Sequence, residues 1–245
     1  MKTLEEIFNI NKGDVVSIVG SGGKTSLLFN LAKELKIKYK VLVSTSAKIF
    51  LPSDDCYDFL YLNLDSYFNN KSNNSVGITV VAKDINKKTN KLIGIDDKDL
   101  DILIMDFDVI LLEADGSKML PIKGWKNHEP PVLSKTTKTI GVFPVNLINK
   151  KIDKKFIYGF HEFNILTDNS EYINFRAIGK ICSKKNGIFK NSNGFLYLFL
   201  NKADTVEEIS ISEELSNYLN EYIICETCKF KICFGSLKKG VYYEH

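Results

Sequence analysis

A glycine-rich segment near the start of the chain has residue types that are suited to binding phosphate. Three glycines fall within positions 20–23, and Lys24 and Thr25 follow them directly. Glycines let successive backbone amides point into one concavity, the lysine can reach the β and γ phosphates, and the threonine hydroxyl can ligate Mg²⁺. The pattern predicts a nucleotide site whose phosphate contacts come from Gly20, Ser21, Gly22, Gly23, Lys24, Thr25 and Ser26.

The same segment departs from the full P-loop pattern at one position. That pattern places a glycine four residues before the final Gly-Lys pair, where this chain has Ile18 or Val19, depending on how the loop is counted. A glycine-rich turn that binds nothing is the alternative interpretation. The apolar run 15–19 before the loop and the periodic apolar residues of 27–35 after it indicate a strand and a helix, and this context favours a phosphate site.

Two carboxylates follow an apolar run in the middle of the chain. The large apolar residues of 109–112 are typical of a strand that is buried on both faces, and Glu113 and Asp115 come directly after them. In P-loop proteins an acidic residue at the tip of a second core strand orients water on Mg²⁺. We expect at least one of these carboxylates to do so, which gives a predicted metal site of Thr25, Glu113 and Asp115. An ordinary acidic turn is the alternative.

The segment 117–131 follows these carboxylates and holds the only tryptophan and three of the five prolines of the chain. Prolines favour an extended, ordered loop, and this loop occupies the place of one that responds to a γ-phosphate. His128 and Glu129 are candidate acid–base groups or substrate ligands. A solvated pair on a surface loop is the alternative, because adjacent side chains point apart in an extended chain.

A second nucleotide motif comes late in the chain, where an apolar run at 195–200 leads into Asn-Lys-x-Asp. In this motif the aspartate accepts two parallel hydrogen bonds from guanine, and adenine presents an acceptor at one of those places. The order of the motifs therefore favours GTP over ATP, with base contacts from Asn201, Lys202 and Asp204. The alternative is that Asp204 or Thr205 caps a helix at about 207–222.

Polar residues also end the strand that is predicted at 40–44. Ligands bind beyond the carboxyl ends of strands in open α/β sheets, so Thr45 and Lys48 are candidates for contacts with Mg²⁺ or phosphate. An ordinary loop is the alternative.

The cysteines near the end of the chain form a weaker pattern. Cys225 and Cys228 have a spacing that can bind zinc or support redox chemistry, and Cys233 lies close by. Only three thiols cluster and no histidine adjoins them, so buried or incidental cysteines are the favoured interpretation.

The order of the predicted elements indicates one α/β domain over residues 1–245. Strands expected at 15–19, 40–44, 108–113, 139–144, 195–200 and 230–234 alternate with helices expected at 4–10, 24–35, 96–107, 156–166 and 207–222. A polar turn between 77–81 and 91–95 predicts a β-hairpin insertion around 76–95. This pattern favours a P-loop NTPase-like, three-layer α/β/α fold with a mostly parallel sheet.

Composition narrows the kind of protein. Hydrophobic residues make up 44% of the 245 residues, which supports a sizeable core, and the net charge is only +3 with scattered lysines. This argues against nucleic-acid binding as the main function. We expect no membrane span and no signal peptide, because apolar runs are short and the first six residues include two glutamates. The five cysteines fit a reducing, cytoplasmic location.

Taken together, the motifs resemble those of the YqeC family, accessory proteins of selenium-dependent molybdenum hydroxylases. The resemblance spans about residues 13–236 and rests on the glycine loop, Val-Ile-Leu-Leu-Glu-Ala-Asp-Gly-Ser, Pro121-x-Lys123, His128-Glu129-Pro130 and the 200–204 segment. Ser46 and Ala47 depart from a threonine-rich stretch of that family. The resemblance implies a cytoplasmic nucleotide-binding protein that helps to install a labile selenium-containing cofactor.

Three functional interpretations follow from these residues. The leading one is an NTPase that uses GTP, or ATP, with Mg²⁺, and whose bound nucleotide switches the 117–131 loop during cofactor maturation. In it, Lys24, Glu113, Asp115, His128 and Glu129 are the candidate catalytic residues. The second is a small-molecule kinase in which His128 or Glu129 activates an acceptor. The third is a non-catalytic carrier of a nucleotide-linked molybdenum cofactor. The expected partners are a nucleotide, a selenium or molybdenum cofactor species and the target hydroxylase.

Overall fold

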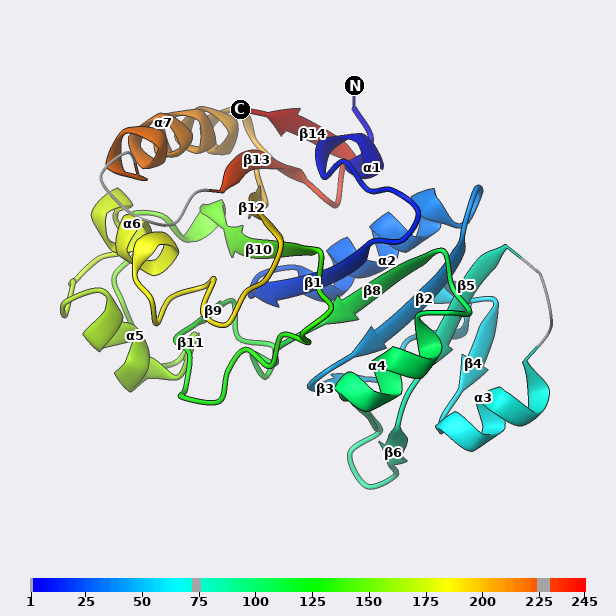
Figure 1. Ribbon diagram of the computed structural model, residues 1–245. Coiled ribbons are helices and arrows are strands. Elements are labelled where there is room, and N and C mark those ends of the chain that lie inside the picture. Colours follow the sequence, from blue (N-terminus) through cyan, green and yellow to red (C-terminus); the bar gives the residue numbers. More distant parts are fainter. Residues whose placement is uncertain (1, 72–75, 224–229) are drawn as a thin grey trace.

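The computed structural model describes residues 2–71, 76–223 and 230–245, and its centre is a sheet of nine strands (Figure 1). The strand order is β14-β13-β12-β10-β1-β8-β2-β5-β4, and every neighbouring pair is parallel except β13 and β14. The strands are β1 (Val15–Gly20), β2 (Lys40–Thr45), β4 (Phe59–Tyr61), β5 (Gly77–Val81), β8 (Val109–Glu113), β10 (Lys138–Pro144), β12 (Phe195–Asn201), β13 (Lys231–Ser236) and β14 (Val241–Glu244).

Helices cover both faces of this sheet. They are α1 (Leu4–Ile7), α2 (Lys24–Leu35), α3 (Leu64–Asn70), α4 (Asp97–Leu103), α5 (Phe160–Leu166), α6 (Phe175–Ser183) and α7 (Val206–Ile223). Side chains alternate along β8: Val109 and Leu111 pack in the core with α1 and α2, whereas Ile110 and Leu112 pack in a second core with α4. A third core joins the other half of that second face to α5, α6 and α7. The predicted three-layer α/β class is confirmed.

Two small sheets lie at the carboxyl ends of the central strands. One is antiparallel, in the order β3 (Lys48–Phe50), β7 (Lys91–Ile93) and β6 (Asp84–Asn86); the other pairs β9 (Ile122–Lys123) with β11 (Ile157–Tyr158) in parallel. The predicted hairpin is therefore wrong in one arm. Residues 77–81 form β5, which runs parallel to β2 inside the central sheet. All five of these residues are buried, as is typical of a parallel strand that is covered on both faces. The strand that forms a hairpin with β7 is β6.

Element boundaries follow local sequence signals. Asp96 caps α4 through a capping box with Asp99, so the helix predicted from residue 96 begins at Asp97. The helix expected at 156–166 begins only at Phe160, because 157–158 form β11 and Gly159 has a left-handed backbone with φ of +65°. Within the described residues, no helix is both long and apolar enough to cross a membrane.

Candidate functional site

The loop between β1 and α2 forms a cradle of backbone amides. Its shape requires glycine, because a Cβ on Gly23 would lie 2.2 Å from Asn201 Nδ2 and one on Gly22 would lie 2.6 Å from Pro144 Cγ. Both glycines also have positive φ, which is +81° at Gly22 and +137° at Gly23. Within the described part of the chain, their amides donate no hydrogen bond to protein, and no side chain caps α2. The amides are therefore available to an anion at the start of the helix.

Two residues of α2 meet the acidic end of β8 beside this cradle. Thr25 Oγ1 donates a hydrogen bond to Glu113 Oε2 at 2.6 Å. Lys24 Nζ lies 3.6 Å from Glu113 Oε1 and 3.4 Å from Asp115 Oδ1, with only 5% of the lysine exposed. Burial acts to lower the pKa of Lys24, but the charges of Asp115 and Glu113 outweigh it and raise that pKa above its ordinary value. The buried ammonium is therefore charged.

These groups fit a magnesium ion. Mg²⁺ prefers oxygen ligands and keeps several waters, so it needs only one or two carboxylates together with phosphate oxygens. The Thr25 hydroxyl and the Glu113 carboxylate are adjacent oxygen donors that line the same pocket as the glycine cradle. Asp115 Oδ1 is a buried oxygen that accepts no hydrogen bond from a described residue, and the Lys24 ammonium lies 3.4 Å from it.

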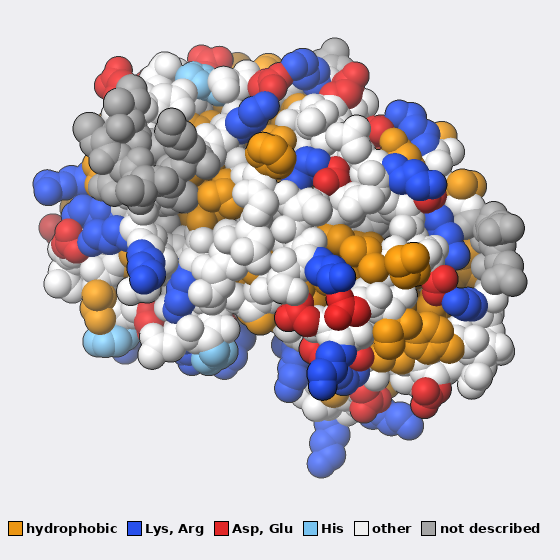
Figure 2. Space-filling view, in the orientation of Figure 1, with side chains coloured by type: hydrophobic (Ala, Val, Ile, Leu, Met, Phe, Trp, Pro, Cys, Tyr) orange, Lys and Arg blue, Asp and Glu red, His pale blue; other side chains and the backbone are white. Residues whose placement is uncertain are grey.

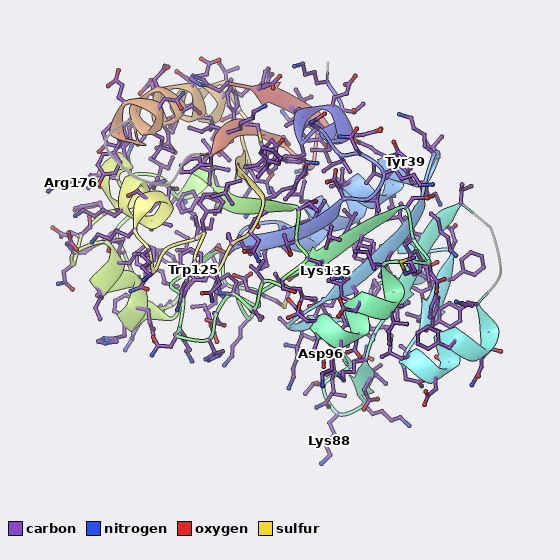
Figure 3. The ribbon with its side chains drawn as sticks, in the orientation of Figure 1. Tyr39, Lys88, Asp96, Trp125, Lys135 and Arg176 are labelled. Atoms are coloured by element: carbon purple, nitrogen blue, oxygen red, sulfur yellow. The ribbon has the colours of Figure 1, made fainter. Side chains whose placement is uncertain are left out.

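Asp115 differs from Glu113 in its surroundings. Its Oδ2 accepts hydrogen bonds from the Gly20 amide at 3.2 Å and from Trp125 Nε1 at 3.0 Å, and Lys123 Nζ lies 3.2 Å away. Trp125 follows β9 and belongs to the loop 117–131 (Figure 3). Asp115 therefore ties the end of β1 to that loop, and the structure separates two carboxylates that the sequence could not distinguish.

The buried lysine beside Asp115 continues this network. Lys123 is fully buried, donates a hydrogen bond to the Gly116 carbonyl at 2.8 Å, and lies 3.5 Å from Glu129 Oε1. Glu129 Oε2 accepts a hydrogen bond from the Lys126 amide at 3.2 Å. His128, by contrast, is exposed. Both residues of the predicted pair line the pocket, but Glu129 is held by a lysine and only His128 is free to turn in solvent.

The Asn-Lys-x-Asp segment lies against the glycine loop. Asn201 Nδ2 donates a hydrogen bond to the Gly22 carbonyl at 2.8 Å. The Asp204 carboxylate accepts a hydrogen bond from the Ser236 hydroxyl, and it lines the pocket together with Asn201 and Lys202. The motif and the P-loop, far apart in sequence, therefore form one wall of the pocket.

Thr205, and not Asp204, caps helix α7. Thr205 and Glu208 exchange hydrogen bonds in the manner of a capping box: the Glu208 amide donates to Thr205 Oγ1 at 3.2 Å, and the Thr205 amide donates to Glu208 Oε2 at 2.9 Å. Asp204 is thus not needed as the cap of α7, and its side chain is left for the pocket.

Other predicted site residues have structural partners. The Thr45 hydroxyl donates to the Glu113 carbonyl at 2.6 Å and accepts from the Ala47 amide, and Thr45 does not line the pocket. The Ser21 amide donates to the Val142 carbonyl at 3.0 Å. Gly20 packs against the same carbonyl, where a Cβ would come within 2.4 Å. Ser26 and Lys48 do line the pocket.

One pocket of about 1370 Å³ joins these groups. It extends from the P-loop and the Asn201 segment to the β3–β7 sheet and the start of the 117–131 loop, and it opens where the outline of the molecule is indented between β3 and β11 (Figures 1 and 2). Sequence reasoning missed several residues that line it: Phe50, Lys91, Ile93, Lys118, Met119, Leu237 and Lys238. The last two follow the carboxyl end of β13, where the same strand-end rule would have found them.

The cysteine pattern gives no metal site within the described residues. Cys233 is buried on β13, and burial raises the pKa of its thiol well above the ordinary value, so the thiol stays protonated. Cys225 and Cys228 lie outside the described residues.

The fold and the site define an α/β protein of the P-loop NTPase-like class, in which the glycine loop follows a central strand of a mostly parallel sheet. The chain belongs to the YqeC family: the model of that family, described as YqeC protein, matches residues 16–161. This range contains the glycine loop, both carboxylates and the His128–Glu129 pair.

Two similar proteins illustrate how far the likeness reaches. The "Uncharacterized protein YqeC" of Escherichia coli (strain K12) is 30% identical over 156 residues, which is 62% of this chain and 60% of the relative's own length. A GTPase in apo form from Pyrococcus abyssi aligns over 93% of this chain and 92% of its own, with 12% identity and a TM-score of 0.37. A TM-score of this size leaves the two backbones too different for a functional comparison.

Proposed function

We propose that the chain binds a nucleoside triphosphate with Mg²⁺ at the P-loop and hydrolyses it, with GTP preferred to ATP. The observation that carries this proposal is the cluster on the pocket wall. There the Thr25 hydroxyl donates to Glu113 at 2.6 Å, and the Lys24 ammonium lies 3.6 Å from the same carboxylate. A hydroxyl, a carboxylate and an ammonium beside unbonded amides are the parts that bind a polyphosphate with a divalent cation.

Each group of this cluster has a distinct function in the proposal. The Lys24 ammonium and the amides of Gly22 and Gly23 bind the phosphate chain, and Thr25 and Glu113 hold Mg²⁺ directly or through water. When bound, Mg²⁺ supplies positive charge that offsets the charge of the phosphate oxygens. Asp115 positions the loop instead of the metal, because its Oδ2 already accepts hydrogen bonds from Gly20 and Trp125.

The preference for guanine depends on Asp204. One of its oxygens accepts the Ser236 hydroxyl, and a carboxylate has capacity for further hydrogen bonds. The hydrogen bond from Asn201 to the Gly22 carbonyl supports the proposal, because it holds the Asn201–Asp204 segment against the glycine loop. A donor pair such as that of guanine suits this acceptor, and adenine lacks it.

A cellular context is part of the same proposal. The γ-phosphate would act on the 117–131 loop through Asp115, which contacts that loop at Lys123 and Trp125. We place this switch in the cytoplasm, in the maturation of the cofactor of a selenium-dependent molybdenum hydroxylase. Membership of the YqeC family supports this context.

Titration with fluorescent N-methylanthraniloyl GDP and ADP, with and without Mg²⁺, tests the proposal. The Lys24→Ala variant is expected to bind GDP at least about a hundredfold more weakly, because a buried charge-assisted contact with phosphate is lost. Thr25→Ala is expected to lose the Mg²⁺ dependence of GTP binding. Lys33→Ala is the matched control, since Lys33 is an exposed lysine of the same helix. Equal affinities of Lys24→Ala and the parent, both folded by circular dichroism, would overturn the proposal.

A second candidate function is a small-molecule kinase. The pocket favours it, because it continues past the P-loop to the β3–β7 sheet and because exposed His128 lines it. Radiolabelled γ-phosphate recovered on an organic acceptor and not in inorganic phosphate would support transfer over hydrolysis. Tight nucleotide binding with no turnover would instead support the carrier of a nucleotide-linked cofactor.

A further inference from the structure

We propose that the end of the pocket away from the P-loop is a second ligand site, which takes a small organic anion with a planar apolar body. This inference rests on the proposed function in one respect: the anion would be the molecule on which the nucleotide-bound state acts. The residues that carry it are Lys48, Phe50, Lys91, Ile93, Lys118 and Met119, and all six line the pocket.

The β3–β7 ladder presents these side chains on one face. Phe50 pairs directly with Lys91 across the two strands, and Lys48 pairs with Ile93. Because side chains alternate along a strand, these four residues share a face. Ile49 and Leu92 between them are buried in the core, and Ile49 also borders the pocket. An aromatic ring, an aliphatic side chain and two ammonium groups therefore form one wall of the pocket.

This wall is built before any ligand arrives. The Gly94 amide donates to the Ala47 carbonyl at 2.9 Å and the Ile95 amide donates to the Thr45 carbonyl at 2.8 Å, which fixes the small sheet against the end of β2. A Cβ on Gly94 would come within 2.6 Å of the Thr45 carbonyl oxygen, so this close approach needs glycine. A wall that is already ordered loses little conformational entropy when a ligand binds.

The lysines at this end of the pocket form no ion pairs within the described residues, although Lys118 Nζ lies 5.8 Å from the centroid of the Tyr158 ring. Within the described residues, no carboxylate forms an ion pair with Lys48, Lys91 or Lys118, whereas Lys24 and Lys123 in the same region are paired with buried carboxylates. Lys91 Nζ lies 4.4 Å from the centroid of the Phe50 ring. This arrangement offers a cation and an apolar face side by side, which suits an anionic group attached to a planar ring.

The loop that faces this wall has an unusual backbone. Lys118 and Met119 are consecutive residues with φ of +50° and +64°. A left-handed conformation is unfavourable for a residue other than glycine, and such strain concentrates at ligand sites. Met119 is also 83% exposed, although methionine is usually buried. Both residues of this strained turn line the pocket. Folding alone would favour neither the left-handed backbone nor an exposed methionine.

The size of the pocket leaves room for two ligands. Sites for single small molecules occupy about 300–1,000 Å³, and this pocket holds about 1370 Å³. A nucleotide at the P-loop wall would therefore leave the β3–β7 end accessible.

Calorimetry with 1-naphthyl phosphate tests the inference, because this probe joins a planar ring to an anion. Titrations use the full chain saturated with GDP and Mg²⁺, so that the P-loop is occupied. We expect binding of 1-naphthyl phosphate and of 1-naphthoate, and at least about tenfold weaker binding of neutral 1-naphthol and of inorganic phosphate. The two anionic probes distinguish a phosphorylated ligand from a carboxylate.

Variants assign the probe to this wall. Lys91→Gln and Phe50→Ala are each expected to weaken 1-naphthyl phosphate binding about tenfold while GDP affinity is unchanged. The matched controls are Lys88→Gln, at the hairpin tip and directed into solvent (Figure 3), and Phe195→Ala, whose ring is 74% exposed outside the pocket. Both controls are expected to bind like the parent.

The outcomes separate this inference from the proposed function. If GDP binds but the probe does not, or if Lys91→Gln and Phe50→Ala bind it like the controls, the second site is wrong and the nucleotide site stands. If GDP fails to bind while the probe still depends on Lys91 and Phe50, the proposed function fails and the second site stands. Displacement of the probe by GDP would place it at the P-loop and overturn the inference.

Discussion

The two walls of the pocket are built in opposite ways. On the P-loop wall, charged and polar side chains are buried and bound to one another across long stretches of sequence, as in Thr25 with Glu113 and Asn201 with Gly22. On the β3–β7 wall, half of the Phe50 ring is exposed and Lys48 and Lys91 form no ion pair within the described residues. The first wall is fixed by its own contacts. On the second wall, the Phe50 side chain and the two ammonium groups remain available to a ligand. The contrast agrees with the two proposals, a nucleotide site on one wall and a second ligand site on the other.

The largest expected effect is on the buried charges behind the P-loop wall. Lys123→Met removes the ammonium that lies 3.2 Å from Asp115 Oδ2 and 3.5 Å from Glu129 Oε1, and breaking a buried ion pair in this way costs about 3–5 kcal/mol of unfolding free energy. Urea denaturation measures it. Adding Glu129→Gln to Lys123→Met is expected to recover part of the loss, because it neutralises the carboxylate that has lost its ammonium, whereas Asp115 still has the Lys24 ammonium at 3.4 Å. A loss below about 1 kcal/mol would show that this network is not what fixes the wall.

The next effect contrasts the two faces of β3. Ile49→Ala opens a cavity in the core and is expected to cost about 2–4 kcal/mol, whereas Phe50→Ala on the pocket face is expected to cost less than about 1 kcal/mol. The two residues are adjacent, so each is the control for the other in thermal or urea unfolding. Similar losses in both variants would mean that the Phe50 ring is part of the core and not an open ligand surface.

A smaller effect is expected at the base-reading end of the P-loop wall. Asp204→Ala should lower the ratio of GDP to ADP affinity about ten- to a hundredfold, because a charged acceptor for guanine is lost. Ser236→Ala removes only the hydroxyl that donates to Asp204 and should keep most of that ratio. Competition between fluorescent GDP and unlabelled nucleotides gives both numbers. An unchanged ratio in Asp204→Ala would assign the carboxylate to structure alone.

The same contrast explains what the sequence could predict. Gly20–Ser26, Glu113 and Asn201–Asp204 each follow an apolar strand, so strand-end logic alone brings them to one edge of a parallel sheet. The central strands and the three-layer class follow from the same apolar runs. These features depend on local patterns that a single sequence carries.

The β3–β7 wall depends on the pairing of two strands that are far apart in the sequence, and a local sequence pattern does not predict that pairing. Lys48–Phe50 is too short and too polar to stand out as a strand. Residues 91–95 are predicted as a hairpin arm, but the face that β7 shares with β3 arises only from the register between the two strands. Residues 77–81 were misassigned for a related reason, because a buried parallel strand and a hairpin arm have similar composition. The difference between Glu113 and Asp115 likewise depends on Lys123 and Trp125, which reach Asp115 only in three dimensions.

The smallest expected effect tests whether burial sets the strength of the P-loop wall. Asp168 is paired with Lys180 and Lys184 at 2.8 and 2.6 Å, but it lies in solvent. Its hydrogen bonds to these two lysines lower its pKa from 3.8 to about 2. Because the folded pKa is depressed, the stabilisation is present above pH 3.8 and is lost as the pH falls toward about 2. Asp168→Asn should flatten the stability profile in that window and lose the stabilisation above it, including at neutral pH, but the loss should be small, since solvent screens exposed pairs. If its cost at pH 7 instead matched that of Lys123→Met, exposed and buried ion pairs would be equally important, and the contrast between the fixed wall and the open one would lose its physical basis.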